Sequence, residues 1–116
     1  MQKLIIFICI IFFLGCTKYQ APDLNITNKR FSVEIDGIGH ILYISKSSEY
    51  YFVLFDAFGV PKANKVLKNG SFKSMKFLPK DSFYDEIFIQ SLDILDKNLK
   101  NKDFILENKQ IRMVEI

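Results

Sequence analysis

Apolar and polar residues alternate between residues 31 and 78, and short turn signals interrupt the alternation. Residues 31–35 read FSVEI, Asp36-Gly37 follows, and residues 40–44 alternate again. A period of two is typical of a strand with one buried face, and Asp-Gly between two such runs predicts a β-hairpin. The apolar positions of both runs then lie on the same face of a sheet.

The next segment, residues 50–56 (YYFVLFD), is apolar on both faces. This pattern predicts either a central strand covered on both sides or a strand that lines a cavity. Residues 63–68 predict a weaker strand, and Asn69-Gly70 is a strong signal for a two-residue turn that leads into residues 72–78. Five strands in series with short turns predict an antiparallel β-meander.

One amphipathic helix is expected after the meander. Pro79 ends the last strand, Asp81 or Ser82 can cap a helix that runs to about Lys97, and Asp85 in its first turn faces the positive end of the helix dipole. Apolar side chains cover about half of the helix circumference. An apolar arc of that width suits a helix that lies in a concave sheet.

The last residues predict a C-terminal hairpin, with strands over residues 104–106 and 111–116 and a turn near Asn108. The fold class is therefore α+β. We expect a single domain over residues 31–116, which is enough chain for one modest core without disulfide bonds.

The first fifteen residues predict an export signal. One positive charge, on Lys3, precedes residues 4–14, an unbroken apolar run of 11 residues. As a helix this run reaches about 16 Å at ~1.5 Å per residue, whereas the hydrocarbon core of a bilayer needs ~30 Å. The run is too short to span a membrane and is typical of a secretory signal peptide.

The end of this run, Phe13-Leu14-Gly15-Cys16, resembles the bacterial lipobox, at which a diacylglyceryl group is transferred to the thiol and the chain is cleaved before the cysteine. The resemblance implies a lipoprotein signal peptide over residues 1–15 and lipidation of Cys16, with diacylglycerol and an N-linked acyl chain such as palmitate. The alternative is an ordinary signal peptide with an incidental cysteine.

Two or three acyl chains attach a protein to a bilayer almost permanently. An Asp directly after the cysteine would resemble the retention signal of inner-membrane lipoproteins, but residue 17 is Thr. This favours the outer membrane and a position facing the periplasm. Residues 16–30 are polar, contain a proline and lack periodicity, so we interpret them as the lipidated cysteine followed by a tether.

Composition argues against several classes of function. The chain has 16 basic and 13 acidic residues, interspersed, so no basic stripe for nucleic acid exists. Cys9 and Cys16 are the only cysteines, which excludes disulfides and cysteine metal sites in the mature domain.

The one histidine, His40, lies on an apolar face and suits a core or rim position. Asp85 and Glu86 have a structural role in a helix's first turn. We therefore expect no catalytic site, metal or cofactor.

The remaining candidate for a function is apolar surface. Tyr51, Val53 and Phe55 on one face of their strand, together with Phe88 and Leu92 of the helix, provide more apolar surface than a two-layer domain of this size needs. These residues form either a phenylalanine-rich core or a cavity for acyl chains, because pockets for apolar ligands are concave and lined in this way.

Residues 50–72 (YYFVLFDAFGVPKANKVLKNGSF) resemble the middle of the LolA/LolB family of lipoprotein-localisation factors. That family forms an unclosed β-barrel, plugged by helices, that holds lipoprotein acyl chains. Phe58, directly before Gly59, matches the apolar residue that the family's outer-membrane receptor projects on a loop for membrane transfer. In the alternative interpretation, Phe58 folds back onto the core.

The resemblance implies a meander curved as a partial, unclosed barrel, packed on the amphipathic helix and followed by the C-terminal hairpin. It also implies an outer-membrane lipoprotein that binds acyl chains, or assists lipid or lipoprotein transfer, without catalysis. The alternative function is a non-catalytic interaction module, an accessory subunit that binds another protein of the cell envelope.

Overall fold

The computed structural model describes residues 19–75 and 82–116. The predicted signal peptide, Cys16 and the segment that holds Pro79 and Asp81 lie outside the described residues. Within the described residues the chain forms one sheet and one helix, α2. The elements are β1 (Asn28–Ile35), β2 (Ile38–Lys46), β3 (Tyr50–Asp56), β4 (Pro61–Lys68), β5 (Ser71–Ser74), α2 (Phe83–Asp96), β6 (Asn101–Leu106) and β7 (Lys109–Glu115).

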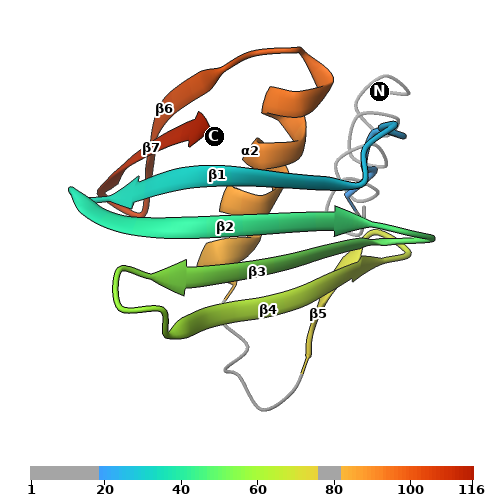
Figure 1. Cartoon of the computed structure of the whole chain (residues 1–116), viewed down its shortest axis with the longest axis horizontal. Helices are drawn as coiled ribbons and strands as arrows, with labels where there is room; N and C mark the ends of the chain where they lie inside the picture. Colours follow the sequence, from blue (N-terminus) through green and yellow to red (C-terminus); the bar gives the residue numbers. More distant parts are fainter. Residues whose placement is uncertain (1–18, 76–81) are drawn as a thin grey trace, which may run out of the picture.

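The sheet has seven strands in the order β5-β4-β3-β2-β1-β7-β6, and every neighbouring pair is antiparallel. The first five strands follow one another as a meander, while β7 pairs with β1 and carries β6 on its outer side (Figure 1). The two edge strands, β5 and β6, are not neighbours, so the sheet is not closed. The predicted α+β class and unclosed antiparallel sheet are confirmed.

Two tight turns fix the register of the meander. Asp36 and Gly37 have φ angles of 51° and 81°, and Asn69 and Gly70 have φ angles of 54° and 77°. Positive φ at both central residues is the hairpin turn whose twist matches that of the strands, and Asn-Gly and Asp-Gly adopt it most readily. The sequence therefore predicted both turns correctly.

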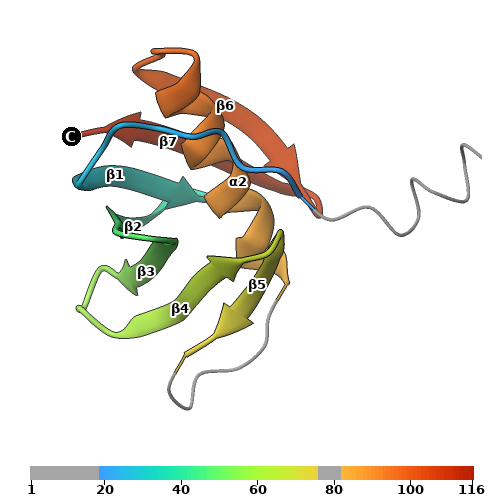
Figure 2. The same cartoon turned by 90° about the vertical axis from the view of Figure 1, so that its right-hand side faces the viewer.

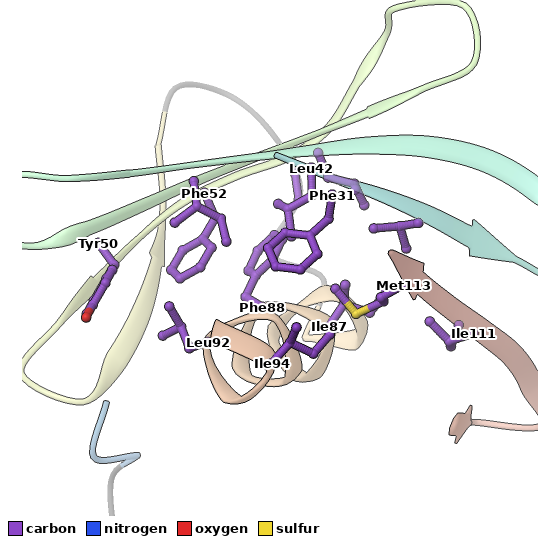
Figure 3. Close-up of a cluster of buried hydrophobic side chains, with 14 of the residues drawn as sticks. Phe31, Leu42, Tyr50, Phe52, Ile87, Phe88, Leu92, Ile94, Ile111 and Met113 are labelled. Atoms are coloured by element: carbon purple, nitrogen blue, oxygen red, sulfur yellow. The ribbon is translucent and has the colours of Figure 1, made fainter. Parts of the chain in front are cut away.

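Helix α2 crosses the sheet on its concave side, and the sheet curls around it (Figures 1 and 2). Phe88 of the helix stacks on Phe52 of β3, with ring centroids 4.8 Å apart and an interplanar angle of 12°. Both rings are fully buried. Figure 3 shows these side chains filling the space between sheet and helix, together with Phe31, Leu42 and Leu92. The centre of the curled sheet is thus a packed core.

Two lysines on the sheet's inner face hold the helix through its acidic residues. The ammonium group of Lys65, in β4, lies 2.5 Å from Oδ1 of Asp85, and Lys65 is only 4% exposed. On the other side of the helix, Lys102 of β6 bonds Gln90 and lies 2.9 Å from Oδ2 of Asp93. Charge pairs this close to the core lose much of their solvent screening, so they fix the helix more firmly than surface pairs.

The segment predicted as a tether is docked on the domain from residue 19 onward, and β1 already begins at Asn28. Residues 19–27 cross one end of the curled sheet, in front of α2 in Figure 2. The backbone amide of Tyr19 donates to the carbonyl of Gly70 over 3.2 Å. The Tyr19 ring stacks beside Phe72 at a centroid distance of 6.5 Å.

The hydroxyl of Tyr50 makes the central contact with this docked segment. It donates to the carbonyl of Pro22 over 2.6 Å and accepts from the amide of Leu24 over 2.9 Å. Lys46 adds bonds to the Asp23 carboxylate and the Leu24 carbonyl. The composition of residues 16–30 predicted a free tether. It did not reveal the docking, because the partners lie more than twenty residues away along the chain.

We predict that Tyr50→Phe loosens residues 19–27 without disturbing the core, because the ring remains and only the hydroxyl is lost. The free energy of unfolding should fall by about 1–2 kcal/mol, the cost of leaving two partly buried backbone groups without their partner. Urea denaturation measures this loss, and hydrogen exchange at the Leu24 amide should accelerate. Tyr43→Phe, on the opposite face of the sheet, is the matched control, and equal losses in both variants would contradict the docking role.

Candidate ligand-binding site

The two ends of the curled sheet differ. Residues 19–27 cover the end that holds the β2–β3 and β4–β5 turns. At the opposite end the β1–β2, β3–β4 and β6–β7 turns surround a pocket of about 530 Å³, which we call the mouth. This volume lies in the range of ~300–1,000 Å³ that small-molecule sites occupy. The apolar and aromatic lining of the mouth includes Ile35, Ile38, His40, Phe58, Phe83 and Tyr84.

Phe58 projects into solvent from the β3–β4 turn and is 92% exposed. Oδ1 of Asp56 accepts hydrogen bonds from the amides of Phe58 and Val60, each over 2.9 Å. The amide of Gly59, whose φ of 81° favours glycine, donates to the Asp56 carbonyl over 3.0 Å. The interpretation in which Phe58 folds back onto the core is therefore wrong, because the residue lies in a closed hydrogen-bonded turn with its ring exposed.

Electrostatics reinforce this turn. The amide of Val60 lowers the pKa of the Asp56 carboxyl below its usual value, and the Phe58 amide and Lys62 act in the same direction. Hydrogen bonds to the ionised form favour that form. Asp56 therefore stays ionised at neutral pH and keeps the turn closed.

Two further apolar side chains accompany Phe58 at this end of the sheet. Ile38 is 61% exposed and Val60 is 49% exposed. We call Ile38, Phe58 and Val60 the tip. A cluster of exposed apolar residues beside an open pocket is the kind of surface that contacts a partner or a lipid.

His40 lies at the inner side of the mouth and is buried, at 9% exposure. Its Nδ1 is 3.0 Å from the carbonyl oxygen of Ile38, a geometry that suits Nδ1–H as the donor. The interpretation of His40 as a core or rim residue is thus confirmed. Its fixed ring forms part of the wall of the mouth.

The structure does not bring the five predicted ligand-binding residues into one cavity. Tyr51, Val53 and Phe55 lie on the outer face of β3, because Tyr50, Phe52 and Leu54 are the residues of β3 that are buried towards α2. Phe88 and Leu92 are fully buried on the inner side. The sheet itself separates the two groups.

The outer face carries a second apolar surface. Tyr43 packs edge-on against Phe55, with ring centroids 5.7 Å apart. Tyr43, Tyr51 and Val53 also line a groove of about 550 Å³, similar in volume to the mouth, that reaches Ile116. Helix α2 lies on the other side of the sheet, so no helix in the described ranges covers this face (Figures 1 and 2). We call Tyr43, Tyr51, Val53 and Phe55 the outer patch.

Asp85 and Glu86 have structural partners, as expected from their place in the first helical turn: Asp85 bonds Lys65, and Glu86 accepts from the side chain of Gln90. Among residues 19–75 and 82–116, no three His, Cys, Asp or Glu side chains are placed to share a metal ion. Within the same ranges, no helix has the length and hydropathy needed to cross a bilayer.

Sequence reasoning missed Ile38 and Val60, the other two residues of the tip. The signal was present in part, since both lie in or beside turns where an apolar residue has no core to enter. No protein-family model, curated protein or solved structure matches the chain. The mouth and the tip are therefore defined by their geometry.

We predict that Asp56→Ala opens the β3–β4 turn, so that amide exchange at Phe58 and Val60 accelerates severalfold. In the folded wild type the pKa of Asp56 is lowered. The stabilisation that the ionised Asp56 gives to the turn is therefore complete above the ordinary Asp pKa of about 3.9, and it is lost as the pH falls through the lowered pKa. Hydrogen exchange by NMR tests both effects. Asp103→Ala, on β6, serves as control; unchanged exchange at Phe58 in the Asp56 variant would refute the assignment.

Proposed function

We propose that this chain is a non-catalytic lipoprotein of the outer membrane, anchored through Cys16, that binds acyl chains of lipids or lipoproteins at the mouth. One observation carries the proposal: the 92% exposed side chain of Phe58 stands at a pocket whose lining combines apolar and aromatic side chains with charged ones. A large aromatic side chain that stays exposed lacks the roughly 1.5–3 kcal/mol that its burial would contribute, unless a ligand or a surface covers it.

The dimensions of the mouth suit part of an acyl chain. The core between Phe52 and Phe88 is packed, so a ligand does not lie beneath the helix. It lies instead against Ile35, Ile38 and Phe83, at the open end of the sheet. Each methylene buried there contributes about 0.8 kcal/mol.

The polar groups at the mouth suit binding better than covalent chemistry. Asp56 is engaged by the turn amides, and the His40 ring by the Ile38 carbonyl. Lys109 lies over the Phe83 ring, 5.3 Å from its centroid. These groups have structural partners, and Ile35, Ile38 and Phe83 supply apolar surface beside them.

The lipobox resemblance supports the anchor, and the resemblance to the LolA/LolB family supports the ligand class. An unclosed barrel that surrounds an amphipathic helix and ends in a hairpin is what that second resemblance implies. Residues 19–27, which dock on the covered end of the sheet, follow closely after Cys16 in the sequence.

We predict that the mature protein takes up a fluorescent fatty acid and that Phe58→Glu or Ile38→Glu weakens this binding about tenfold, which corresponds to ~1.4 kcal/mol. Ile105→Glu is the matched control, because Ile105 is 75% exposed but does not line the mouth. Fluorescence titration and native mass spectrometry measure binding. A wild-type protein that neither copurifies with lipid nor takes up the probe would contradict the proposal.

A second candidate function, a protein-interaction module, is favoured by the outer patch. Its side chains are partly exposed, lie side by side on β2 and β3, and are not covered by α2. If the patch binds an envelope protein, crosslinking in cells captures one partner in stoichiometric amount. Tyr43→Glu should then abolish the crosslink and leave fatty-acid binding unchanged, whereas a crosslink that persists in this variant excludes the outer patch as the interface.

A further inference from the structure

We propose that the outer edge of β6 pairs with β6 of a second copy of the chain, so that two sheets join into one antiparallel sheet. Residues of β6 line neither the mouth nor the groove beside the outer patch. The backbone of β6, its exposed side chains and its own sequence lead to this partner.

The sheet ends at β6, and half of the backbone groups of this strand point toward β7. Leu106 pairs with Lys109, and the two residues between them have φ angles of 50° and 65°. A turn of this kind closes on a hydrogen-bonded pair, so every second residue of β6, counted back from Leu106, exchanges hydrogen bonds with β7. The amide of Glu115 donates to the carbonyl of Lys100 over 3.0 Å, which agrees with this alternation.

The other half of the backbone groups point away from the sheet, and they belong to Asn101, Asp103 and Ile105. No described strand pairs with this edge of β6. Unpaired N–H and C=O groups along a regular strand form a template for another strand. Short length protects such an edge: β5, at the opposite side, has four residues, whereas β6 has six and keeps a one-to-one register with β7.

The side chains of β6 do not protect its edge either. An exposed lysine often serves this purpose, but Lys102 faces the helix and pairs with Asp93. On the outer face of the sheet, Ile105 is 75% exposed. The charge of Asp103, on the same face, is compensated by Arg112 of β7, whose Nε lies 3.3 Å from Oδ1. An exposed isoleucine beside a compensated charge is a surface that another strand can cover.

The sequence of β6 restricts how two copies can pair. Residues that lie opposite each other in a sheet point to the same face, so a twofold axis between the strands passes through a residue. An axis at Asp103 places two aspartates opposite each other, and an axis at Lys102 does the same with two lysines. An axis at Ile105 places Asp103 opposite Glu107. Like charges directly opposite each other destabilise a strand pair, so these registers are disfavoured.

An axis at Phe104 avoids these conflicts. Asp103 of each protomer then lies opposite Ile105 of its partner, and their outward backbone groups form hydrogen-bonded pairs on both sides of the axis. The two Asp103 carboxylates lie on a diagonal, each beside its own Arg112. The two Phe104 rings meet on the axis as a non-hydrogen-bonded pair, in which side chains approach most closely. Because Phe104 packs against the buried core, this pair extends the core across the interface.

This self-complementarity points to a second copy as the partner. The same strand supplies both sides of the contact, as in a twofold dimer with an isologous interface. Main-chain hydrogen bonds between added strands provide the affinity in contacts of this kind. The strands run in opposite directions and the β6–β7 turn borders the mouth, so the two mouths open at opposite ends of the joined sheet.

Disulfide crosslinking of the full chain in cells tests the register. Asp103→Cys and Ile105→Cys are made in separate chains with different tags, because both side chains are exposed. Co-expression and mild oxidation should link the two tags, since opposite residues have Cα atoms about 5.5 Å apart, within disulfide reach. Each variant alone should give at least tenfold less dimer, because identical positions lie on a diagonal of ~7–8 Å. The wild-type chain measures crosslinking through its native cysteines.

Ile105→Pro tests the backbone hydrogen bonds. Proline removes an N–H that points outward and leaves the bonds to β7 in place. Native mass spectrometry of the full chain, released from detergent micelles, should show a dimer for the wild type and for Ile105→Thr, which keeps the N–H. Ile105→Pro should be monomeric. Circular dichroism shows whether this variant is folded, and the crosslinking experiment decides where it is not.

Three results would overturn the inference. The first is a mixture of the two cysteine variants that gives no more dimer than each variant alone. The second is a wild-type chain that is monomeric and becomes crosslinked at β6 to a different protein. The third is a dimer that persists in folded Ile105→Pro. Fatty-acid binding reports on the mouth, which contains no residue of β6, so its loss or retention leaves the inferred dimer unaffected.

Discussion

Phe52 and Phe88 lie face to face at the centre of the curled sheet, with their ring centroids 4.8 Å apart. This stack sets the distance between α2 and β3, and the sheet curls until its inner side chains close around it. Because the interior is then filled, apolar ligands can be accommodated only at the ends or on the outer face. The position of the mouth thus depends on a contact that lies well away from it.

Charge pairs on both sides keep the helix over this stack. Lys65 and Lys102 reach Asp85 and Asp93 from strands near opposite edges of the sheet. The bond from Lys102 lowers the pKa of Asp93, so this pair stabilises the fold above the ordinary carboxyl pKa and is lost as the pH falls through the lowered value. The helix is therefore held by packing at its centre and by electrostatics at its flanks.

The two ends of the curled sheet carry different features. Hydrogen bonds from Tyr50 and Lys46 bind residues 19–27 across one end. The Asp56 turn presents Phe58 at the other. Strand length sets the separation between residues 19–27 and the mouth, so the same antiparallel geometry that builds the core also places these two features at opposite ends of the sheet.

Local signals made part of this structure predictable. Asp36-Gly37 and Asn69-Gly70 fix their turns through backbone conformation alone, which a sequence reveals directly. The orientation of β3 was not predictable in this way, because both of its faces are apolar and only pairing with β2 and contact with Phe88 decide which face is buried.

Long-range contacts set the remaining features. The docking of residues 19–27 depends on Tyr50, 28 residues from Pro22 along the chain, and composition carries no trace of it. The place of Phe58 on an apolar loop was implied by a family resemblance. Its full exposure depends on the hydrogen bonds that Asp56 makes within the turn, and Ile38 joins it at the tip only because β1–β2 and β3–β4 turn at the same end of the sheet.

The most direct test of the ligand site is an NMR titration of the ¹⁵N-labelled mature protein with a short-chain fatty acid. We expect saturable shifts of the amide signals of His40, Phe58 and Tyr84, which surround the mouth, while those of Tyr51 and Val53 stay fixed. Shifts confined to Tyr51 and Val53 would place the apolar ligand on the outer face and contradict the assignment of the mouth.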